Sequence, residues 1–221
     1  MIKPQKHYRE VSALNDINFD VYQGDRIGLI GDNGSGKTTL LRIIAGLYKK
    51  TRGAVNVKGT MAAFLQLGAG MERDLTTLEN IFLFGAIVGL ERKVIRRRLG
   101  DILGFAEIED FLHYPLRDLS AGTVQRLVFS IAHYVESDIL ILDEMLASGD
   151  IGFREKCYKA LEDNVNMSKT IIIASHQTEV IKRFCKKVLL LDKGRQVAFG
   201  PTKEILDIYF RSKEKACGGG P

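Results

Sequence analysis

The sequence predicts an α/β fold with a mostly parallel sheet, and three observations support this prediction. Short apolar runs bounded by polar residues are typical of strands that a parallel sheet buries on both faces. Such runs occupy residues 27–30, 139–142, 170–174 and 188–191. A glycine-rich turn joins the first run to a helical pattern. Between residues 75 and 134, apolar residues recur at helical spacing, which predicts a helical insert in the alternating chain.

The size and composition of the chain fit one globular domain. It has 221 residues, of which 45% are hydrophobic, and this suffices for a sizeable core. The net charge of +5 suits an anionic ligand or a membrane-facing surface equally well, and it is too diffuse to indicate nucleic acid binding. No segment resembles a signal peptide or reaches the ~20 apolar residues of a membrane helix. We therefore expect another chain to provide any membrane-spanning part.

The first part of the chain contains three further strand candidates. Residues 13–22 alternate partly between apolar and polar side chains, and residues 53–59 alternate between two glycines. Residues 61–65 form an apolar run that ends at Gln66. We expect the first two segments to belong to an N-terminal antiparallel β portion, and the third to be a buried strand.

The later part of the chain alternates helices and strands. Residues 153–164 place their apolar side chains on one face and predict a crossover helix. Residues 193–195 predict a hairpin turn, and Thr202 is the expected N-cap of the last helix. We expect a single domain with a core at about 1–74 and 135–200, a helical subdomain at about 75–134, and a terminal helix and tail at 201–221.

The glycine-rich turn fits the pattern G-x-x-x-x-G-K-[ST] of a phosphate-binding loop. Backbone N–H groups in such a loop form an anion-binding concavity, and the helix that follows points its positive end at the same oxygens. We expect Lys37 to reach the β- and γ-phosphates of a triphosphate, and the Thr38 hydroxyl to bind magnesium. The expected nucleotide-binding residues of the loop are Gly31, Asn33, Gly34, Ser35, Gly36, Lys37, Thr38 and Thr39.

Two carboxylates end the second apolar run. Asp143 follows the run directly, so it lies at the carboxyl edge of the predicted sheet, where such folds bind ligands. We expect Asp143 to bind magnesium through water. Glu144 would point the other way and act as the general base that polarises the attacking water.

Two further polar residues follow predicted strands. His176 comes shortly after residues 170–174, where an imidazole could contact the γ-phosphate and orient water or Glu144. Gln66 follows residues 61–65, and its amide oxygen could complete the magnesium shell. The alternatives are a polar loop residue for His176 and a surface glutamine for Gln66.

Ser120 and Gly122 open a helix in the insert, at an N-terminus that can donate N–H groups to an anion. An ordinary helix cap is the alternative. This second anion site lies far from the phosphate loop in sequence and in the expected fold. It becomes useful if two copies of the chain meet head to tail, each offering this helix end to the other's ATP.

Taken together, these motifs resemble the nucleotide-binding subunit of an ATP-binding-cassette transporter over nearly the whole chain. The resemblance implies a P-loop NTPase core, and an ATPase that binds ATP and Mg²⁺ and works as a homodimer with separate transmembrane permease subunits. It also implies a peripheral place on the cytoplasmic face of the inner membrane, and no nucleic acid partner. Tyr8, with His7 as a weaker candidate, matches the aromatic residue that stacks on adenine, and Asp150 matches a contact to the partner subunit.

Two departures from the family pattern concern the signature and the loop after the catalytic carboxylate. The usual signature is L-S-G-G-Q, and here Ala121 and Thr123 replace a glycine and the glutamine. Met145 stands where proline is commoner. Segments 67–71, 75–81 and 143–153 are similar to the branch that exports polysaccharides, including O-antigen, capsule and teichoic acid, in which relaxed signatures are usual.

Other functions remain open at this stage. A transporter ATPase for another cargo, such as a lipid or a drug, is one alternative. A cassette ATPase that serves DNA repair or translation is a second, although such proteins typically carry tandem cassettes or long coiled-coil inserts. A non-hydrolysing regulatory cassette is a third, and the presence of both Glu144 and His176 argues against it.

Overall fold

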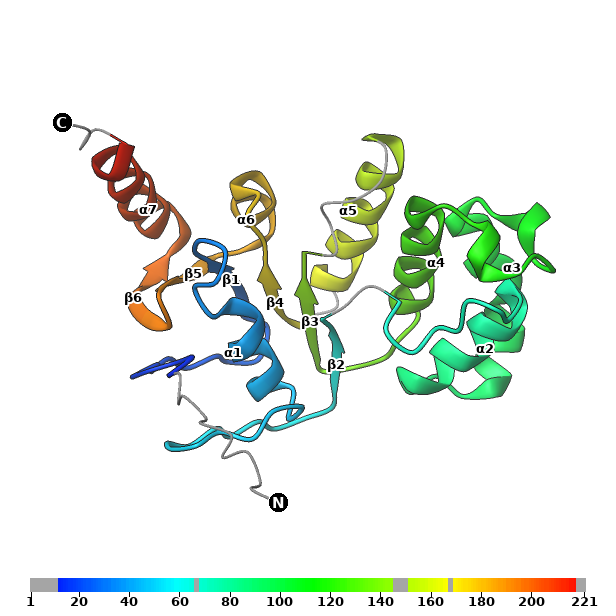
Figure 1. Cartoon of the computed structure of the whole chain (residues 1–221), viewed down its shortest axis with the longest axis horizontal. Coiled ribbons are helices and arrows are strands. Elements are labelled where there is room, and N and C mark those ends of the chain that lie inside the picture. The colour runs from blue at the N-terminus through cyan, green and yellow to red at the C-terminus, as the bar shows by residue number, and fades with distance from the viewer. Residues whose placement is uncertain (1–11, 66–67, 145–150, 167–168, 218–221) are drawn as a thin grey trace, which may run out of the picture.

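The computed structural model describes residues 12–65, 68–144, 151–166 and 169–217. Its centre is a six-stranded sheet with the strand order β2-β3-β4-β1-β5-β6 (Figure 1). The strands are β1 (Arg26–Ile30), β2 (Met61–Phe64), β3 (Ile139–Asp143), β4 (Thr170–Ala174), β5 (Lys187–Asp192) and β6 (Arg195–Pro201). Neighbouring strands are parallel except β5 and β6, which form an antiparallel pair joined by the predicted turn. The prediction of a mostly parallel sheet is therefore confirmed.

Helices cover both faces of this sheet, and a further group of helices lies beside it. They are α1 (Lys37–Ile44), α2 (Thr77–Ile87), α3 (Arg92–Ala106), α4 (Ala121–His133), α5 (Ile151–Asn166), α6 (Thr178–Phe184) and α7 (Thr202–Cys217), with short 3₁₀ turns at Glu109–Phe111 and Leu116–Asp118. Figure 1 shows α1 on one side of the strands and α5 and α6 on the other. Among the α-helices of the described ranges, α6 is the one that the sequence pattern did not predict.

Alternate side chains of each central strand enter two separate apolar clusters. In β3, Leu140 and Leu142 belong to the cluster beneath α5 and α6, whereas Ile141 belongs to the cluster beneath α1. The same division holds for β4, where Ile171 and Ile173 lie in the first cluster and Ile172 in the second. A strand with this environment must be apolar on both faces, which explains the continuous apolar runs in the sequence.

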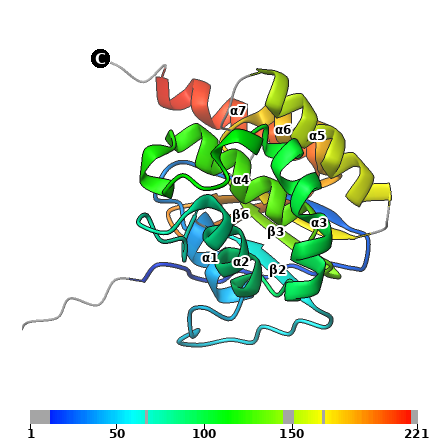
Figure 2. The same ribbon diagram turned by 90° about the vertical axis from the view of Figure 1, so that its right-hand side faces the viewer.

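The helices α2, α3 and α4 pack against one another beside the sheet, at the right of Figure 1. Their shared interior includes Ile81, Ile102 and Ile131, all fully buried. Helix α2 begins with a capping box, in which Thr76 accepts from the Glu79 N–H and the Glu79 carboxylate accepts from the Thr76 N–H. Viewed from that side, these three helices stand in front of the sheet (Figure 2).

The expectation of strands at residues 13–22 and 53–59 is wrong for the described residues. Ile17, Phe19 and Val21 alternate inward as predicted, and the Phe19 ring lies 5.6 Å from that of Phe199. Their backbone nevertheless joins the sheet only through an isolated bridge between Asn15 and Arg195. Residues 53–59 are exposed throughout, so no buried face favours strand formation there. Among the named strands of the described ranges, the antiparallel pair is β5 and β6, and the bridge from Asn15 to Arg195 is parallel.

Within the described ranges, no helix combines the length and the apolar character that crossing a bilayer requires.

Candidate functional site

The phosphate-binding pattern folds as a loop between β1 and α1, and its end glycines are required by the backbone. A Cβ atom at Gly31 would lie 2.3 Å from the Leu191 carbonyl oxygen, so no side chain fits there. Gly36 is the N-cap of α1 with φ at 103°, in the left-handed region that favours glycine. The loop therefore turns sharply from the sheet edge into the positive end of a helix.

Lys37 folds back over this loop instead of pointing into solvent. Its Nζ atom donates to the carbonyl oxygens of Gly31 at 2.8 Å and Asp32 at 3.1 Å, and the residue is buried. The Ser35 Oγ atom is also buried and has no hydrogen-bond partner in the described part of the chain. A buried hydroxyl without a partner calls for an explanation, and an acceptor oxygen of a bound anion would supply its missing bond.

The other loop positions are open or peripheral. Asn33 and Gly34 form an exposed tip, and a Cβ atom at Gly34 would meet nothing within 4 Å. Thr39 lies half-buried in the first turn of α1. The loop thus combines a buried inner side, where Ser35 and Lys37 lie, with an open tip.

Thr38 and Asp143 meet at the edge of the sheet, although 105 positions separate them. The Thr38 hydroxyl donates to a carboxylate oxygen of Asp143 at 2.7 Å. Burial raises the pKa of the Asp143 carboxyl, the Thr38 hydrogen bond opposes this, and the charge of Glu144 adds to the rise. A hydroxyl and a carboxylate are hard oxygen donors, and Mg²⁺ typically takes one or two carboxylates and keeps several waters. The pair therefore fits a magnesium ion.

Glu144 and His176 lie at the same edge because β3 and β4 are parallel and in register at Asp143 and Ala174. The Glu144 N–H donates to the Ala174 carbonyl at 2.9 Å, and a Glu144 carboxylate oxygen lies 3.2 Å from Nδ1 of His176. Both side chains are about half exposed. Glu144 has φ at 52°, a left-handed conformation that is uncommon outside glycine and that clusters at functional sites.

Ser120 is the N-cap of α4. Its Oγ atom accepts from the Thr123 N–H at 3.1 Å and lies 2.8 Å from the Thr123 hydroxyl. Gly122 carries no local constraint, because a Cβ atom there would be 3.8 Å from the Ser120 Oγ atom, an ordinary contact. Figure 1 shows β2 and β3 between α1 and α4, so one copy of the chain does not bring this helix end to its own phosphate loop.

Three predicted site residues, Tyr8, Gln66 and Asp150, lie outside the described residues. The structure adds one contact that the sequence analysis missed. Asp32 in the phosphate loop forms an ion pair with Lys213 of α7, and the Tyr209 hydroxyl lies 3.5 Å from the same carboxylate oxygen. The sequence analysis found no signal for it, because Tyr209 and Lys213, 177 and 181 positions away from Asp32, belong to no motif found in the sequence.

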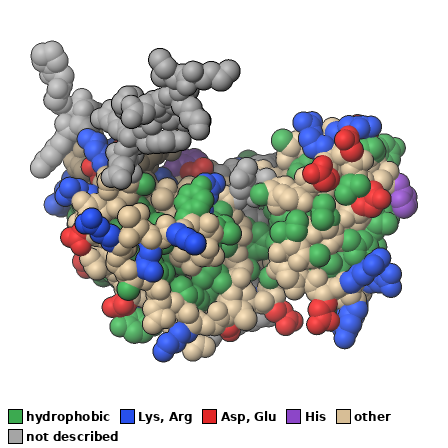
Figure 3. Space-filling view, turned by 60° about the horizontal axis from the view of Figure 1, so that its bottom comes forward, with side chains coloured by type: hydrophobic (Ala, Val, Ile, Leu, Met, Phe, Trp, Pro, Cys, Tyr) green, Lys and Arg blue, Asp and Glu red, His purple; other side chains and the backbone are tan. Residues whose placement is uncertain are grey.

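The helical part of the molecule carries exposed apolar side chains. Figure 3 shows hydrophobic side chains gathered on the face that α2 to α4 contribute. The large exposed apolar residues of this part are Ile87, Phe111 and Tyr114. Exposed apolar patches with a polar border commonly mark interaction sites.

Comparisons with known proteins agree on one family. The family model described as "ABC transporter" matches residues 14–147. An O-antigen export system ATP-binding protein of Klebsiella pneumoniae is 39% identical over 201 residues, which are 91% of this chain and 82% of that protein. A teichoic acids export ATP-binding protein of Bacillus anthracis is 39% identical over 197 residues, covering 89% of this chain and 36% of that longer protein.

Solved structures show the same fold. An ATP-binding subunit of an ABC transporter superposes with a TM-score of 0.77 at 25% identity, covering 89% of this chain and 87% of the other. The ATP-binding cassette MJ0796, solved as a dimer in a post-hydrolysis state with ADP and Pi, gives a TM-score of 0.75 at 23% identity, covering 88% of this chain and 94% of the other.

Proposed function

The chain belongs to the ATP-binding-cassette transporter family, and from this premise we propose that it is the ATP-hydrolysing subunit of a polysaccharide exporter. The observation that carries the proposal is the meeting of four side chains at one sheet edge. Thr38 contacts Asp143, and Glu144 beside it contacts His176. These contacts support a site that combines a phosphate-binding loop, a metal-binding pair and a general base.

The phosphate loop binds the triphosphate. Its backbone N–H groups and the N-terminus of α1 surround the anion, while the Ser35 hydroxyl gains the acceptor that it lacks. Lys37 exchanges its bonds to the Gly31 and Asp32 carbonyls for bonds to phosphate oxygens. Because an ammonium binds an ionised phosphate more strongly than a neutral carbonyl, this exchange favours the nucleotide-bound loop.

Thr38 and Asp143 are the residues that would hold Mg²⁺. When bound, the ion neutralises charge on the β- and γ-phosphates and stabilises the transition state of phosphoryl transfer. The hydrogen bond between Thr38 and Asp143 orients both oxygen donors in advance. Burial of Asp143 disfavours its negative charge, so a bound cation relieves a cost that the fold imposes.

Glu144 accepts the proton of the attacking water, and His176 orients the Glu144 carboxylate. The water oxygen forms a bond to the γ-phosphorus, the bond from that phosphorus to the bridging oxygen breaks, and the proton passes to Glu144. His176 lies 3.2 Å from the carboxylate, at a distance that suits this orienting role.

A second copy of the chain completes the site. Within one copy, no atom of the described residues would crowd a Cβ atom at position 122, and the α4 N-terminus is exposed. A missing side chain at a helix N-terminus leaves room for an anion to approach the backbone N–H groups. The Ser120 and Gly122 end of each copy would therefore cover the ATP bound to the other, and closure and opening of this dimer would drive transport.

The names of the relatives support the proposed cargo and membrane partner. The Klebsiella pneumoniae relative is named for O-antigen export and the Bacillus anthracis relative for teichoic acids export, so we infer a polysaccharide cargo of that type. A separate membrane subunit would carry it, and the exposed apolar residues of the helical part offer that subunit a contact surface. The chain would then be peripheral, on the cytoplasmic face of the inner membrane.

Binding and association measurements on the purified chain test the proposal. We expect a fluorescent ATP analogue to bind in a Mg²⁺-dependent manner, and light scattering to show a dimer at saturating ATP when hydrolysis is blocked. Absence of Mg²⁺-dependent binding would refute the nucleotide site, and a monomer under saturation would refute the shared site. Stimulation of hydrolysis by the cognate membrane subunit with a lipid-linked polysaccharide, compared with a lipid lacking the polysaccharide, tests the cargo.

A further inference from the structure

The phosphate loop is held from two sides by two lysines. The carbonyl oxygen of Asp32 accepts from Lys37, and the Asp32 carboxylate pairs with Lys213 of α7. The Tyr209 hydroxyl lies 3.5 Å from the same carboxylate oxygen, and the Lys213 Nζ atom lies 5.4 Å from the centre of the Tyr209 ring. Asp32 is therefore the point where the last helix of the chain meets the proposed nucleotide site.

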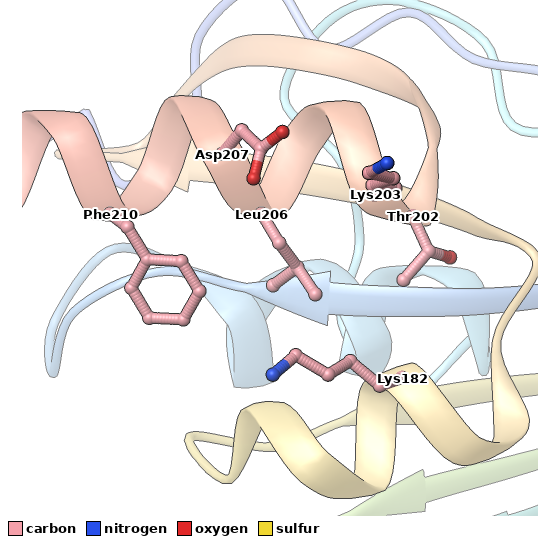
Figure 4. Close-up of a pocket in the computed structure, with 6 residues that line it drawn as sticks. All are labelled: Lys182, Thr202, Lys203, Leu206, Asp207 and Phe210. Carbon is pink, nitrogen blue, oxygen red and sulfur yellow. The ribbon is translucent and has the colours of Figure 1, made fainter.

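Contacts at the N-terminal end of helix α7 fix its position, and this fixes the direction from which Lys213 approaches Asp32. Ile205 and Leu206 are buried, the Thr202 hydroxyl donates to the Cys185 carbonyl at 2.7 Å, and the Thr202 N–H donates to the Lys186 carbonyl. Figure 4 shows Leu206 and Phe210 on the side of α7 that faces Lys182 of α6. Ile205, Tyr209 and Lys213 follow at intervals of four, so they share another face of the helix.

The charges explain why such a contact matters for an anionic ligand. Asp32 is a carboxylate inside a loop that is to receive phosphates, and like charges at short range repel. Lys213 neutralises it, and the Lys213 hydrogen bond holds the pKa of Asp32 below its usual range, so the carboxylate stays ionised and paired. Without this partner, the loop would present an uncompensated negative charge to the incoming nucleotide.

We infer that Lys213 and Tyr209 are positioning residues for the nucleotide site: they neutralise and hold Asp32 so that the phosphate loop accepts an anionic ligand. The inference rests on the proposed ATP site and adds the last helix to it. Both residues act through Asp32 and not on the reacting atoms. Removing them should therefore lower the affinity for the nucleotide and leave the rate of the chemical step unchanged.

The test measures the dissociation constant for ATP in variants of the full chain. Lys213→Met should weaken ATP binding about two- to fivefold, the size expected of an exposed ion pair, and should raise KM while leaving kcat unchanged. Lys213→Arg should restore the affinity because it restores the charge. Tyr209→Phe should have a smaller effect in the same direction. Arg211→Met removes an exposed charge from the same helix and should leave the affinity unchanged.

The same substitutions in an Asp32→Asn background separate this role from a general charge effect. Once Asp32 carries no charge, Lys213→Met should change the affinity by less than about 1.5-fold, because the pair no longer exists. An equal loss in both backgrounds would overturn the inference, as would an effect of Arg211→Met equal to that of Lys213→Met. Thermal unfolding of each variant shows whether the fold is retained.

Failure of the inference and failure of the proposed function give different results. If the wild-type chain binds no ATP, the proposed function is wrong, and the role of Lys213 and Tyr209 at an ATP site is wrong with it. If the wild type binds ATP with Mg²⁺ and Lys213→Met binds it equally well, only the role of α7 is wrong. High salt provides a second readout, since screening should reduce the difference between Lys213→Met and the wild type.

Discussion

Nδ1 of His176 lies 3.2 Å from Oε1 of Glu144, although 32 positions separate the two residues. The contact follows from the sheet, because β3 and β4 are parallel and end together at Asp143 and Ala174. A carboxylate that would otherwise be free to rotate in solvent thereby acquires a neighbour that restricts it. The general-base role that we propose for Glu144 requires such an arrangement, since the base must be within reach of one water and in one orientation.

Replacing Glu144 with glutamine should separate nucleotide binding from hydrolysis. The amide retains the shape of the side chain and cannot accept a proton, so we expect ATP binding to persist and steady-state hydrolysis to fall at least about 100-fold. The ATP-bound dimer should then accumulate, because the step that opens it is blocked. Phosphate release and light scattering on the same sample measure both effects.

A matched control for this prediction is Glu179→Gln. Glu179 is a strongly exposed carboxylate on α6 that pairs with Lys182. We expect this variant to hydrolyse ATP at the wild-type rate. If the Glu144→Gln variant hydrolysed ATP at the wild-type rate, another group would have to accept the proton.

Replacing Asp143 with asparagine should stabilise the ligand-free protein and abolish Mg²⁺-dependent hydrolysis. Burial raises the pKa of Asp143, which means that the fold disfavours its negative charge. Asparagine still accepts the Thr38 hydrogen bond but carries no charge, so we expect a gain of about 1 kcal/mol in the free energy of unfolding at pH 7. Chemical denaturation without Mg²⁺ measures this gain.

The pH dependence of that gain checks its cause. The pKa of Asp143 is higher in the folded than in the unfolded state. The wild type therefore loses stability relative to Asp143→Asn as the pH rises from the unfolded-state pKa to the folded-state pKa. Below the unfolded pKa both side chains are neutral and the two proteins should be equally stable. Asp192→Asn, an exposed carboxylate at the end of β5, should show no comparable gain.

Much of this site could be predicted from the sequence because its parts are local. The phosphate loop lies within nine consecutive residues, and its residue types and spacing fit one known pattern. Asp143 and Glu144 directly follow an apolar run, and the carboxyl ends of parallel strands meet at one edge. From that rule alone, without the register of β3 and β4, we expect Glu144 and His176 to lie near each other.

The remaining features depend on pairings that no local pattern encodes. Ile17, Phe19 and Val21 alternate like a strand, yet alternation reports only which side chains turn inward and not whether the backbone finds a partner. The contact from Asp32 to Lys213 joins two charged residues whose sequence neighbours give no sign of it. Helix α6 has only seven residues, too few for a clear helical period.

Ser120 should have two separable roles, as the cap of α4 and as a phosphate contact across the dimer. Ser120→Ala removes the acceptor for the Thr123 N–H, so we expect a loss of about 1 kcal/mol in stability and weaker ATP-driven dimerisation. Ser120→Asp keeps a good N-cap and adds a negative charge where a phosphate should lie. Its stability should be near that of the wild type, whereas its dimerisation should be lost.

Thermal unfolding and light scattering on the two Ser120 variants measure these effects in parallel. Dimerisation of Ser120→Asp at the wild-type ATP concentration would contradict a phosphate contact at this helix end. An unchanged melting temperature for Ser120→Ala would contradict the capping role. Thr123→Gln brings the segment nearer to the usual signature and tests whether the departure at this position weakens the dimer.

Asp25 should contribute to stability in a pH-dependent manner through Lys187, at the start of β1 and β5. The two side chains are 3.0 Å apart, and the Asp25 carboxylate also accepts from the Tyr22 N–H. Burial raises the pKa of Asp25, but the hydrogen bonds from Tyr22 and Lys187 outweigh it and lower the pKa overall. The contribution is therefore present above the unfolded pKa and lost as the pH falls through the lower folded pKa.

Asp25→Asn should cost about 0.5–1 kcal/mol at pH 7 and progressively less in acid, whereas Asp20→Asn, at an exposed position nearby, should cost little at any pH. A constant difference between Asp25→Asn and the wild type from pH 7 to pH 3 would show that the charge of Asp25 does not stabilise the fold.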